Sequence, residues 1–261
     1  MSACDLNGTG VLVTRPAEHA QSLMAAIRQM GGKPTLFPGV QIEAIQAQEM
    51  ASRLALLATG IDLVVFVSPT AVRLGVSLLM ERFNSLGHLR FAAVGQSTAA
   101  ELNKHGLTEV IVPDGASGGE SLASCPEMHR VAGRSVLVVR GEGGNNTLET
   151  ILRGRGASVS FLECYRRSLP VSDFGAVEKL LREGRIGAWM ATSGEILDNL
   201  LRLAGKKAAL LRQTPLFVNH PHVASRAFSQ AVEVIFVTRG GDAGMSAGLG
   251  AWFCRSRATM P

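Results

Sequence analysis

Short apolar runs alternate along most of the chain with longer stretches whose apolar residues recur every three or four positions. The clearest runs contain no polar residue and lie at 11–13, 63–67, 91–94 and 136–139. Uninterrupted runs of this length are typical of strands buried on both faces of a parallel sheet. The alternation of such strands with amphipathic helices therefore predicts an α/β fold with right-handed crossovers.

Local signals indicate where several helices begin. Pro16 stands after the first run and suits the first helical position, because proline needs no amide partner there. Ser68 followed by Pro69 predicts an N-cap, and the spacing of Thr98 and Glu101 fits a capping box. We expect each of these helices to start at the carboxyl end of a strand.

The chain also repeats itself once. Arg15 and Arg140 lie 125 positions apart in similar runs, and Ser68 and Ser193 are separated by the same interval. Two further apolar blocks recur at an offset of 124, where 91–94 matches 215–218 and 110–112 matches 234–236. The repeat predicts two flavodoxin-like parallel-sheet domains, with ligand sites beyond the carboxyl ends of their strands.

Two extended segments, 35–42 and 159–167, also correspond by the repeat. Each lies between one strand-helix unit and the rest of its half of the chain. We therefore expect them to form a two-stranded connector between the domains.

Composition narrows the class of protein. Hydrophobic residues make up 46% of the chain and charged residues 18%, which is enough for packed cores. The formal net charge of +5 favours acidic partners, but Lys and Arg are dispersed, so we expect no nucleic-acid binding. The amino-terminal residues lack the pattern of a signal peptide and no segment is long enough to span a bilayer, so we expect a cytoplasmic protein without membrane contact.

Several common chemistries are poorly supported. The first strand ends in TRPAEH rather than in a dinucleotide fingerprint, and no nucleophile elbow is present. The four cysteines have no C-x-x-C spacing, and His220 and His222 have no third ligand at a recognisable distance, so we expect no metal. The carboxylates do not cluster at the predicted strand ends, which argues against a carboxylate-pair mechanism.

The strand ends instead offer arginine, hydroxyl and amide groups, which bind carboxylates or phosphates. Arg15, Arg140 and the amides of the loop starting at Gly141 are candidate ligand groups, as are Ser68 and Ser193. Each serine can equally be a helix cap alone, and the glycine-rich loop can equally be a plain turn.

In its order of motifs the chain resembles the uroporphyrinogen-III synthase family. The resemblance spans about residues 10 to 250. It lies in these motifs, taken in order: TRP at 14–16, VSPTAV at 67–72, AVGQSTA at 93–99, VLVVRGEGG at 136–144, ECYRR at 163–167, ATS at 191–193 and VNHPHVASRAF at 218–228. The stretch 238–261 matches less well, and we expect residues 253–261 to form a frayed tail.

The resemblance implies that the chain is exchanged between the two domains. Residues 1–36 with 168–261 would form a discontinuous first domain, and 41–162 the second, with connectors near 37–40 and 163–167. It also implies a monomer that makes a transient contact with the deaminase preceding it in the pathway.

The resemblance further implies an activity. The enzyme would close hydroxymethylbilane, a linear tetrapyrrole polyacid, to uroporphyrinogen III with loss of water and inversion of the last pyrrole ring, through a spiro intermediate and without a cofactor. Tyr165 matches the family's tyrosine in ECYRR and is the candidate catalytic group, because a phenol can donate to the leaving oxygen. Ser97, Thr98 and His220 match positions at the substrate site.

One alternative remains open from the residues themselves. A two-lobed protein that binds a small anion without catalysis also has two α/β lobes and paired connectors. An exported version would carry a signal peptide, which the start of this sequence does not resemble.

Overall fold

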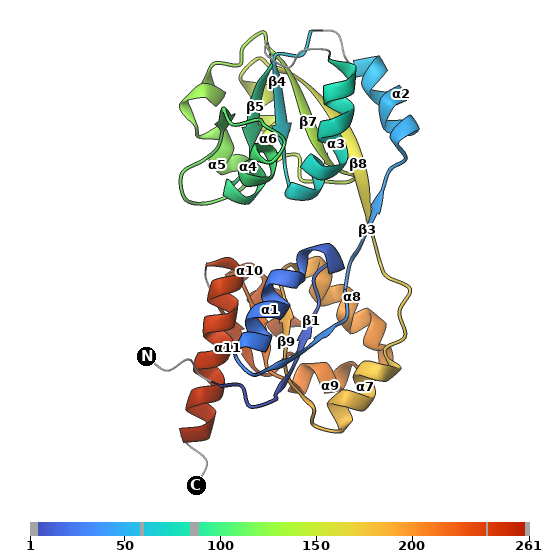
Figure 1. The fold of residues 1–261 in the computed structure, drawn as a ribbon, viewed down its shortest axis with the longest axis vertical. Coiled ribbons are helices and arrows are strands. Elements are labelled where there is room, and N and C mark those ends of the chain that lie inside the picture. Colours follow the sequence, from blue (N-terminus) through green and yellow to red (C-terminus); the bar gives the residue numbers. More distant parts are fainter. Residues whose placement is uncertain (1–4, 58–59, 84–88, 239, 259–261) are drawn as a thin grey trace. The chain divides into compact units, whose positions relative to one another are not determined.

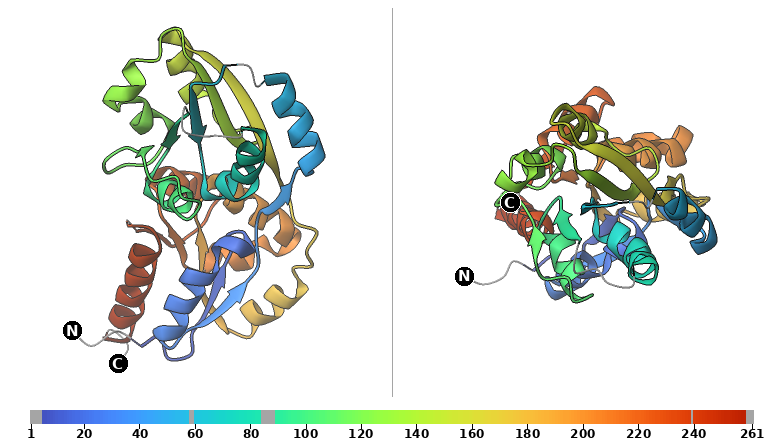
Figure 2. Two further views of the ribbon diagram at one scale, coloured as in Figure 1. Left: turned by 45° about the horizontal axis from the view of Figure 1, so that its top comes forward. Right: turned by 90° about the horizontal axis from the view of Figure 1, so that it is seen from above.

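The computed structural model describes residues 5–57, 60–83, 89–238 and 240–258. Contacts divide the chain into two compact units, each built around a parallel-dominated sheet with helices on both faces (Figures 1 and 2). Unit 1 comprises Met1–Gln41 and Ser168–Pro261, and unit 2 comprises Ile42–Arg167. The predicted α/β class with two parallel-sheet units is confirmed.

Unit 1 contains a five-stranded sheet of order β11-β10-β9-β1-β2. Its strands are β1 (Gly10–Val13), β2 (Lys33–Leu36), β9 (Ile186–Ala191), β10 (Leu216–Val218) and β11 (Ile235–Val237). Its α-helices are α1 (Gln21–Gln29), α7 (Gly175–Arg182), α8 (Gly194–Ala204), α9 (Ala208–Gln213), α10 (Pro221–Ser229) and α11 (Gly241–Ala258). Short 3-10 turns precede α1 (Ala17–His19) and α9 (Gly205–Lys207).

Unit 2 contains a six-stranded sheet of order β3-β8-β7-β4-β5-β6. Its strands are β3 (Gln41–Ala44), β4 (Leu63–Phe66), β5 (Arg90–Ala93), β6 (Val110–Ile111), β7 (Ser135–Gly141) and β8 (Ser158–Ser168). Its helices are α2 (Ala47–Leu57), α3 (Pro69–Arg82), α4 (Gln96–Asn103), α5 (Gly119–Ala123), α6 (Thr147–Gly154) and the 3-10 turn Pro126–His129.

The two sheets realise the sequence repeat through exchanged strands. Read in one direction, unit 1 has the order β2-β1-β9-β10-β11 and unit 2 has β8-β7-β4-β5-β6, with β3 added at the edge. The repeat makes β7 the counterpart of β1 and β4 the counterpart of β9. With β3 set aside, each sheet therefore takes two strands from one half of the chain and three from the other, and each has the 2-1-3-4-5 order of a flavodoxin-like sheet.

The packing of the core explains why apolar and polar residues do not alternate along the strands. All four residues of β4 are buried, and they alternate between two hydrophobic clusters on opposite faces of the sheet. Val64 and Phe66 pack in one cluster, whereas Leu63 and Val65 pack in the other. Because helices cover both faces, a polar residue at any of these positions would be buried without a partner.

The helix starts agree with the sequence expectations only in part. Ser68 and Ser193 are N-caps, accepting hydrogen bonds from the amides of Ala71 at 3.0 Å and Ile196 at 3.2 Å, as predicted. The capping box at Thr98 is wrong, because α4 begins one turn earlier with Gly95 as its N-cap. Pro16 also lies outside a helix, since its ψ of 143° is extended.

The carboxyl-terminal region differs from the expected frayed tail. Helix α11 runs to Ala258. Phe253 packs against the unit 1 core, and a Cβ added at Gly187 would lie 3.2 Å from its ring and 2.7 Å from Thr9 Cγ2. A tail over 253–258 is therefore wrong, and residues 259–261 lie outside the described part.

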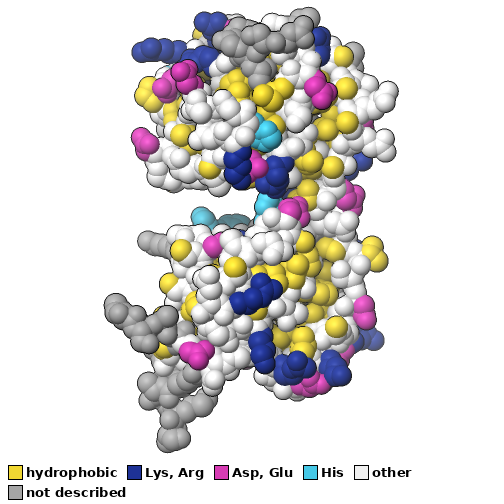
Figure 3. Space-filling view, in the orientation of Figure 1, with side chains coloured by type: hydrophobic (Ala, Val, Ile, Leu, Met, Phe, Trp, Pro, Cys, Tyr) yellow, Lys and Arg dark blue, Asp and Glu magenta, His cyan; other side chains and the backbone are white. Residues whose placement is uncertain are grey.

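Within the described residues, no helix has both the length and the apolar character needed to cross a membrane. On the face drawn in Figure 3, Lys and Arg side chains form small groups interspersed with acidic residues. Residues 163–167 are the end of β8, and 37–40 lie between β2 and β3. Their role as connectors stays a prediction.

Candidate functional site

A cavity of about 600 Å³ opens at the carboxyl edge of the unit 2 sheet. It lies beyond the ends of β4 and β7, the neighbouring strands at which the order of the sheet reverses. Ligands bind at this switch point in open α/β sheets. We call it the unit 2 cavity. Its lining includes Val67, Ser68, Ser117, Gly118, Glu120, Arg140, Gly141, Gly144, Asn145, Thr147, Glu149, Phe161, Tyr165 and Arg167.

Arg140 stands near the end of β7 and is only 9% exposed. Its guanidinium lies 3.6 Å from the centre of the Phe161 ring and donates to Asn146 Oδ1 at 2.8 Å. A longer contact of 3.4 Å joins it to the carboxylate of Glu163. The Nε atom is buried and has no hydrogen-bond partner in the described structure. An unpaired donor on a buried cation is costly, which marks this side chain as a candidate for binding an anion.

Tyr165 is brought to the cavity by an irregularity in β8. Arg140 pairs with Glu163 along the sheet, but the next residue, Gly141, pairs with Tyr165, so Cys164 is one extra residue. Bulges of this kind redirect a side chain, and here Cys164 and Tyr165 are buried in succession in one cluster. The tyrosine ring lies against Gly141, where an added Cβ would be 2.4 Å from its Cε2 atom.

The hydroxyl of Tyr165 reaches the start of α3. Its Oη atom is 3.2 Å from Ser68 Oγ, the oxygen that caps this helix. The neighbouring thiol is no rival nucleophile, because burial raises the pKa of Cys164 to about 12. The phenol is thus the hydroxyl group that β8 presents to the cavity, next to the Glu163 carboxylate that contacts Arg140.

The glycine-rich loop after β7 lies along the cavity as the sequence suggested. Gly143 has a φ of +65°, a conformation that favours glycine, and the loop leads directly into α6. Asn145 accepts the amide of Thr147 at 2.6 Å. The side chain of Asn146, the N-cap, accepts from Arg140 instead of capping the helix. The loop therefore fixes the arginine.

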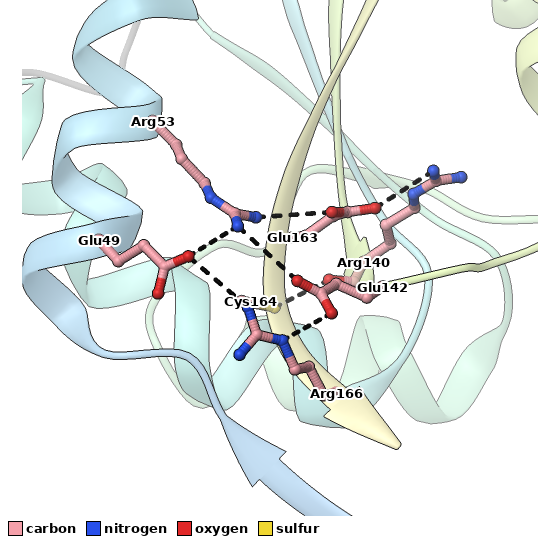
Figure 4. Close-up of polar contacts among 7 residues, drawn as sticks. All are labelled: Glu49, Arg53, Arg140, Glu142, Glu163, Cys164 and Arg166. Atoms are coloured by element: carbon pink, nitrogen blue, oxygen red, sulfur yellow. Dashed lines mark hydrogen bonds and ion pairs between the residues drawn. The ribbon is translucent and has the colours of Figure 1, made fainter. Parts of the chain in front are cut away.

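An ionic cluster ties α2 to the ends of β7 and β8 (Figure 4). Glu142 accepts from Arg166 Nε at 2.6 Å, and Arg53 contacts Glu49 at 2.7 Å and Glu163 at 3.5 Å. The hydrogen bond from Arg166 lowers the pKa of Glu142. The expectation that carboxylates do not cluster at strand ends is therefore wrong, but each of these carboxylates is paired with arginine.

In unit 1 the corresponding strand ends carry the other predicted residues. Arg15 follows β1 and forms an ion pair of 2.6 Å with Asp242 of α11. Ser193 caps α8, and His220 caps α10 by accepting the amide of His222 at 3.1 Å. Among the described residues, no group of three or more His, Cys, Asp or Glu is placed to hold a metal ion.

Two predicted residues lie apart from this cavity within unit 2. Thr98 is 2% exposed and sits inside α4, whereas Ser97 is exposed in the same turn. Neither is among the residues that line the unit 2 cavity.

Sequence reasoning missed several residues that line it. Phe161, which stacks on the arginine, looked like an ordinary apolar strand residue, and Arg167 looked like a solvated surface charge. Ser117 and Gly118 stand before the short helix α5, and the glycine pair at 118–119 was the available signal. Their place on the cavity depends on the order of the strands, which no local pattern specifies.

The arrangement combines a buried guanidinium, loop amides and one phenol on a partly apolar cavity. These groups can bind a carboxylate and donate a hydrogen bond to a leaving oxygen.

A family model and the sequences of known proteins indicate the same family. The family model for "Uroporphyrinogen-III synthase HemD" matches residues 21–240. The uroporphyrinogen-III synthase of Escherichia coli is 32% identical over 196 residues, covering 74% of this chain and 79% of that protein. The enzyme of Salmonella typhimurium is 34% identical with the same coverage.

Solved structures share the fold. A mutant uroporphyrinogen III synthase from Thermus thermophilus gives a TM-score of 0.64 at 19% identity, covering 97% of this chain and all of that one. The Helicobacter pylori uroporphyrinogen-III synthetase gives 0.59 at 14% identity, covering 94% and 99%.

Proposed function

The chain belongs to the uroporphyrinogen-III synthase family, and on this premise we propose that the unit 2 cavity carries part of its substrate site. The family match over residues 21–240 is the observation that carries the function. The enzyme is a lyase of tetrapyrrole and haem biosynthesis. The comparisons do not favour a two-lobed anion-binding protein without catalysis.

The proposed substrate is hydroxymethylbilane, and the reaction is its closure to uroporphyrinogen III. The C–O bond of the hydroxymethyl group breaks, and the oxygen leaves as water after gaining a proton. The substituted carbon of the last ring attacks the resulting cation and forms a spiro intermediate. The original bond between that carbon and its methylene bridge then breaks, and the free α-carbon of the same ring attacks the released methylene cation, which inverts the ring. Loss of one proton restores the aromatic ring, so electrons and protons balance without a cofactor.

Within this reaction we assign Tyr165 to assist loss of the hydroxyl. The O–H of a phenol can donate a hydrogen bond to the departing oxygen. The side chain is 6% exposed at the cavity, and its hydroxyl lies at the end of β4. Those contacts support a fixed donor.

Arg140 and the amides beginning at Gly141 are assigned to a carboxylate of the substrate. The buried, unpaired Nε and the neighbouring loop support this role. A guanidinium binds a carboxylate more strongly than a neutral donor does. Holding the polyacid in one bent conformation would then direct attack toward the substituted carbon.

The other predicted binding residues are kept as candidates. Ser193 and His220 cap helices at the strand ends of unit 1, and Arg15 is paired with Asp242, so a substrate carboxylate would have to compete for it. Ser97 and Thr98 are the second and third residues of α4. We further propose a cytoplasmic monomer that meets the preceding deaminase transiently.

A coupled assay tests the function. Porphobilinogen and a deaminase generate the bilane, this protein is added, and the oxidised products are separated by isomer. We expect an excess of isomer III, because unassisted closure gives isomer I. Isomer I alone would reject the activity.

Tyr165→Phe removes the phenolic hydroxyl while keeping the ring that packs against Gly141. We expect kcat to fall about 100-fold, at the low end of the range for a lost general acid, with little change in KM. A wild-type rate would remove Tyr165 from the mechanism and leave the family assignment intact.

A further inference from the structure

Three contacts fix Tyr165 at its edge of the cavity. The ring lies against Gly141, the backbone oxygen accepts the amide of Glu142 at 2.8 Å, and the hydroxyl meets Ser68. The first two contacts hold the ring and the main chain. The orientation of the hydroxyl itself depends on the third.

Ser68 Oγ makes two hydrogen-bonding contacts. It accepts the amide of Ala71 at 3.0 Å as the cap of α3. A hydroxyl carries one hydrogen and two lone pairs, so the cap leaves its hydrogen available. Tyr165 Oη, at 3.2 Å, is the acceptor within reach. If the serine donates here, the phenol keeps its own hydrogen for another acceptor.

We infer that Ser68 is a positioning residue, which donates to Tyr165 Oη and so directs the phenolic hydrogen toward the leaving hydroxyl of the substrate. This inference rests on the proposed role of Tyr165 and deepens it. It replaces direct substrate binding as the role of Ser68.

The repeat supplies an internal comparison. Ser193 occupies the equivalent place in unit 1 and caps α8 with nearly the same geometry, a 3.2 Å bond from Ile196. The residue that corresponds to Tyr165 by the offset of 125 is Val40, which has no hydroxyl. Both serines therefore cap a helix, but the hydroxyl pair exists in unit 2.

The composition makes this contact directly observable. Tyr165 is the single tyrosine of the chain, so protein labelled with 3-fluorotyrosine has one 19F resonance. We expect Ser68→Ala to shift this resonance and Ser68→Thr, which keeps a hydroxyl, to restore it. Ser193→Ala removes an equivalent helix cap in unit 1 and should leave the 19F resonance of Tyr165 unshifted. An unchanged resonance in Ser68→Ala would overturn the inference.

Kinetics test whether the contact matters for the reaction. We expect Ser68→Ala to lower kcat for isomer III about 5- to 10-fold, as for one lost hydrogen bond, with KM unchanged and Ser68→Thr near wild type. In a Tyr165→Phe background the same change should have no further effect on kcat. If the double variant instead lost kcat by the product of the two single-variant losses, the positioning role would be overturned.

Thermal unfolding separates an effect on stability from an effect on catalysis. Ser68→Ala and Ser193→Ala should each lower Tm by about 2–4 °C, as expected for one lost cap. A Ser68 variant that loses kcat only in proportion to its folded fraction would contradict the inference. A wild-type rate for Tyr165→Phe would instead reject the proposed function of the phenol, and with it the kinetic part of this inference.

Discussion

Arg15 and Arg140 show how far equivalent residues can diverge. They occupy the same position in the repeat, at the ends of β1 and β7. Arg15 pairs with Asp242 at 2.6 Å, whereas Arg140 has a longer contact of 3.4 Å with Glu163, stacks on Phe161 and keeps an unpaired Nε. The free capacity to bind an anion is therefore greater at Arg140.

Arg140→Lys tests this capacity. Lysine keeps the charge but loses the planar stack on Phe161 and the second arm of the fork. We expect KM for the bilane to rise about tenfold or more, because hydrogen bonds to charged groups contribute about 1.5–3 kcal/mol. Steady-state kinetics in the coupled assay measures the effect.

Arg155→Lys is the matched control. This arginine also lies in unit 2 and donates to the backbone oxygens of Ala123 and Met128, at 2.6 Å and 3.0 Å, but it does not line the cavity. Equal rises in KM for both variants would argue against a specific role for Arg140.

At the scale of elements, side chains join helices that the sequence does not place together. Asp198 of α8 accepts from Arg226 of α10 at 2.8 Å and from Gln230 at 2.6 Å. The hydrogen bond from Arg226 lowers the pKa of Asp198. The pair thus fastens two helices that cover one sheet.

Asp198→Asn should weaken this link in a pH-dependent way. The folded pKa lies below the unfolded value near 3.8, so the carboxylate stabilises the fold above that pH and ceases to do so as pH falls through the folded pKa. At pH 7 we expect a loss on the order of 0.5–1 kcal/mol, since the carboxylate is one-third exposed. Urea unfolding at pH 7 and pH 3 measures it, and an equal loss at both pH values would contradict the ionic explanation.

At the scale of the whole chain, the exchanged strands make the two halves interdependent. β1 pairs with β9 in unit 1, and β4 pairs with β7 in unit 2. Each pair joins strands from opposite halves of the sequence. The boundary between the two repeats of the sequence is therefore not a boundary between folding units.

A cut between Gly133 and Arg134 tests this dependence. We expect fragments 1–133 and 134–261 to be unfolded alone, because each leaves an interior strand of both sheets without one of its two neighbours. Coexpression should restore a folded 1:1 complex, and residues 42–167 should fold alone. Circular dichroism and amide NMR spectra check these outcomes. A folded 1–133 fragment would contradict the exchange.

The sequence by itself determined the class of fold, the duplication and the residues at the strand ends. Buried strands must be apolar on both faces, and Ser68 and Ser193 carry a cap signal that acts over three residues. Such local constraints can be recognised without knowing which strands are neighbours.

Only the tertiary structure decided which of these residues meet. The extra residue in β8 turns Tyr165 onto Gly141 and toward Ser68, and Asp242 reaches Arg15 across 227 positions of sequence. It also placed Phe161 on Arg140 and made Gly95 the N-cap of α4. These outcomes depend on strand order and register, which are set by the summed packing of distant segments rather than by any local pattern.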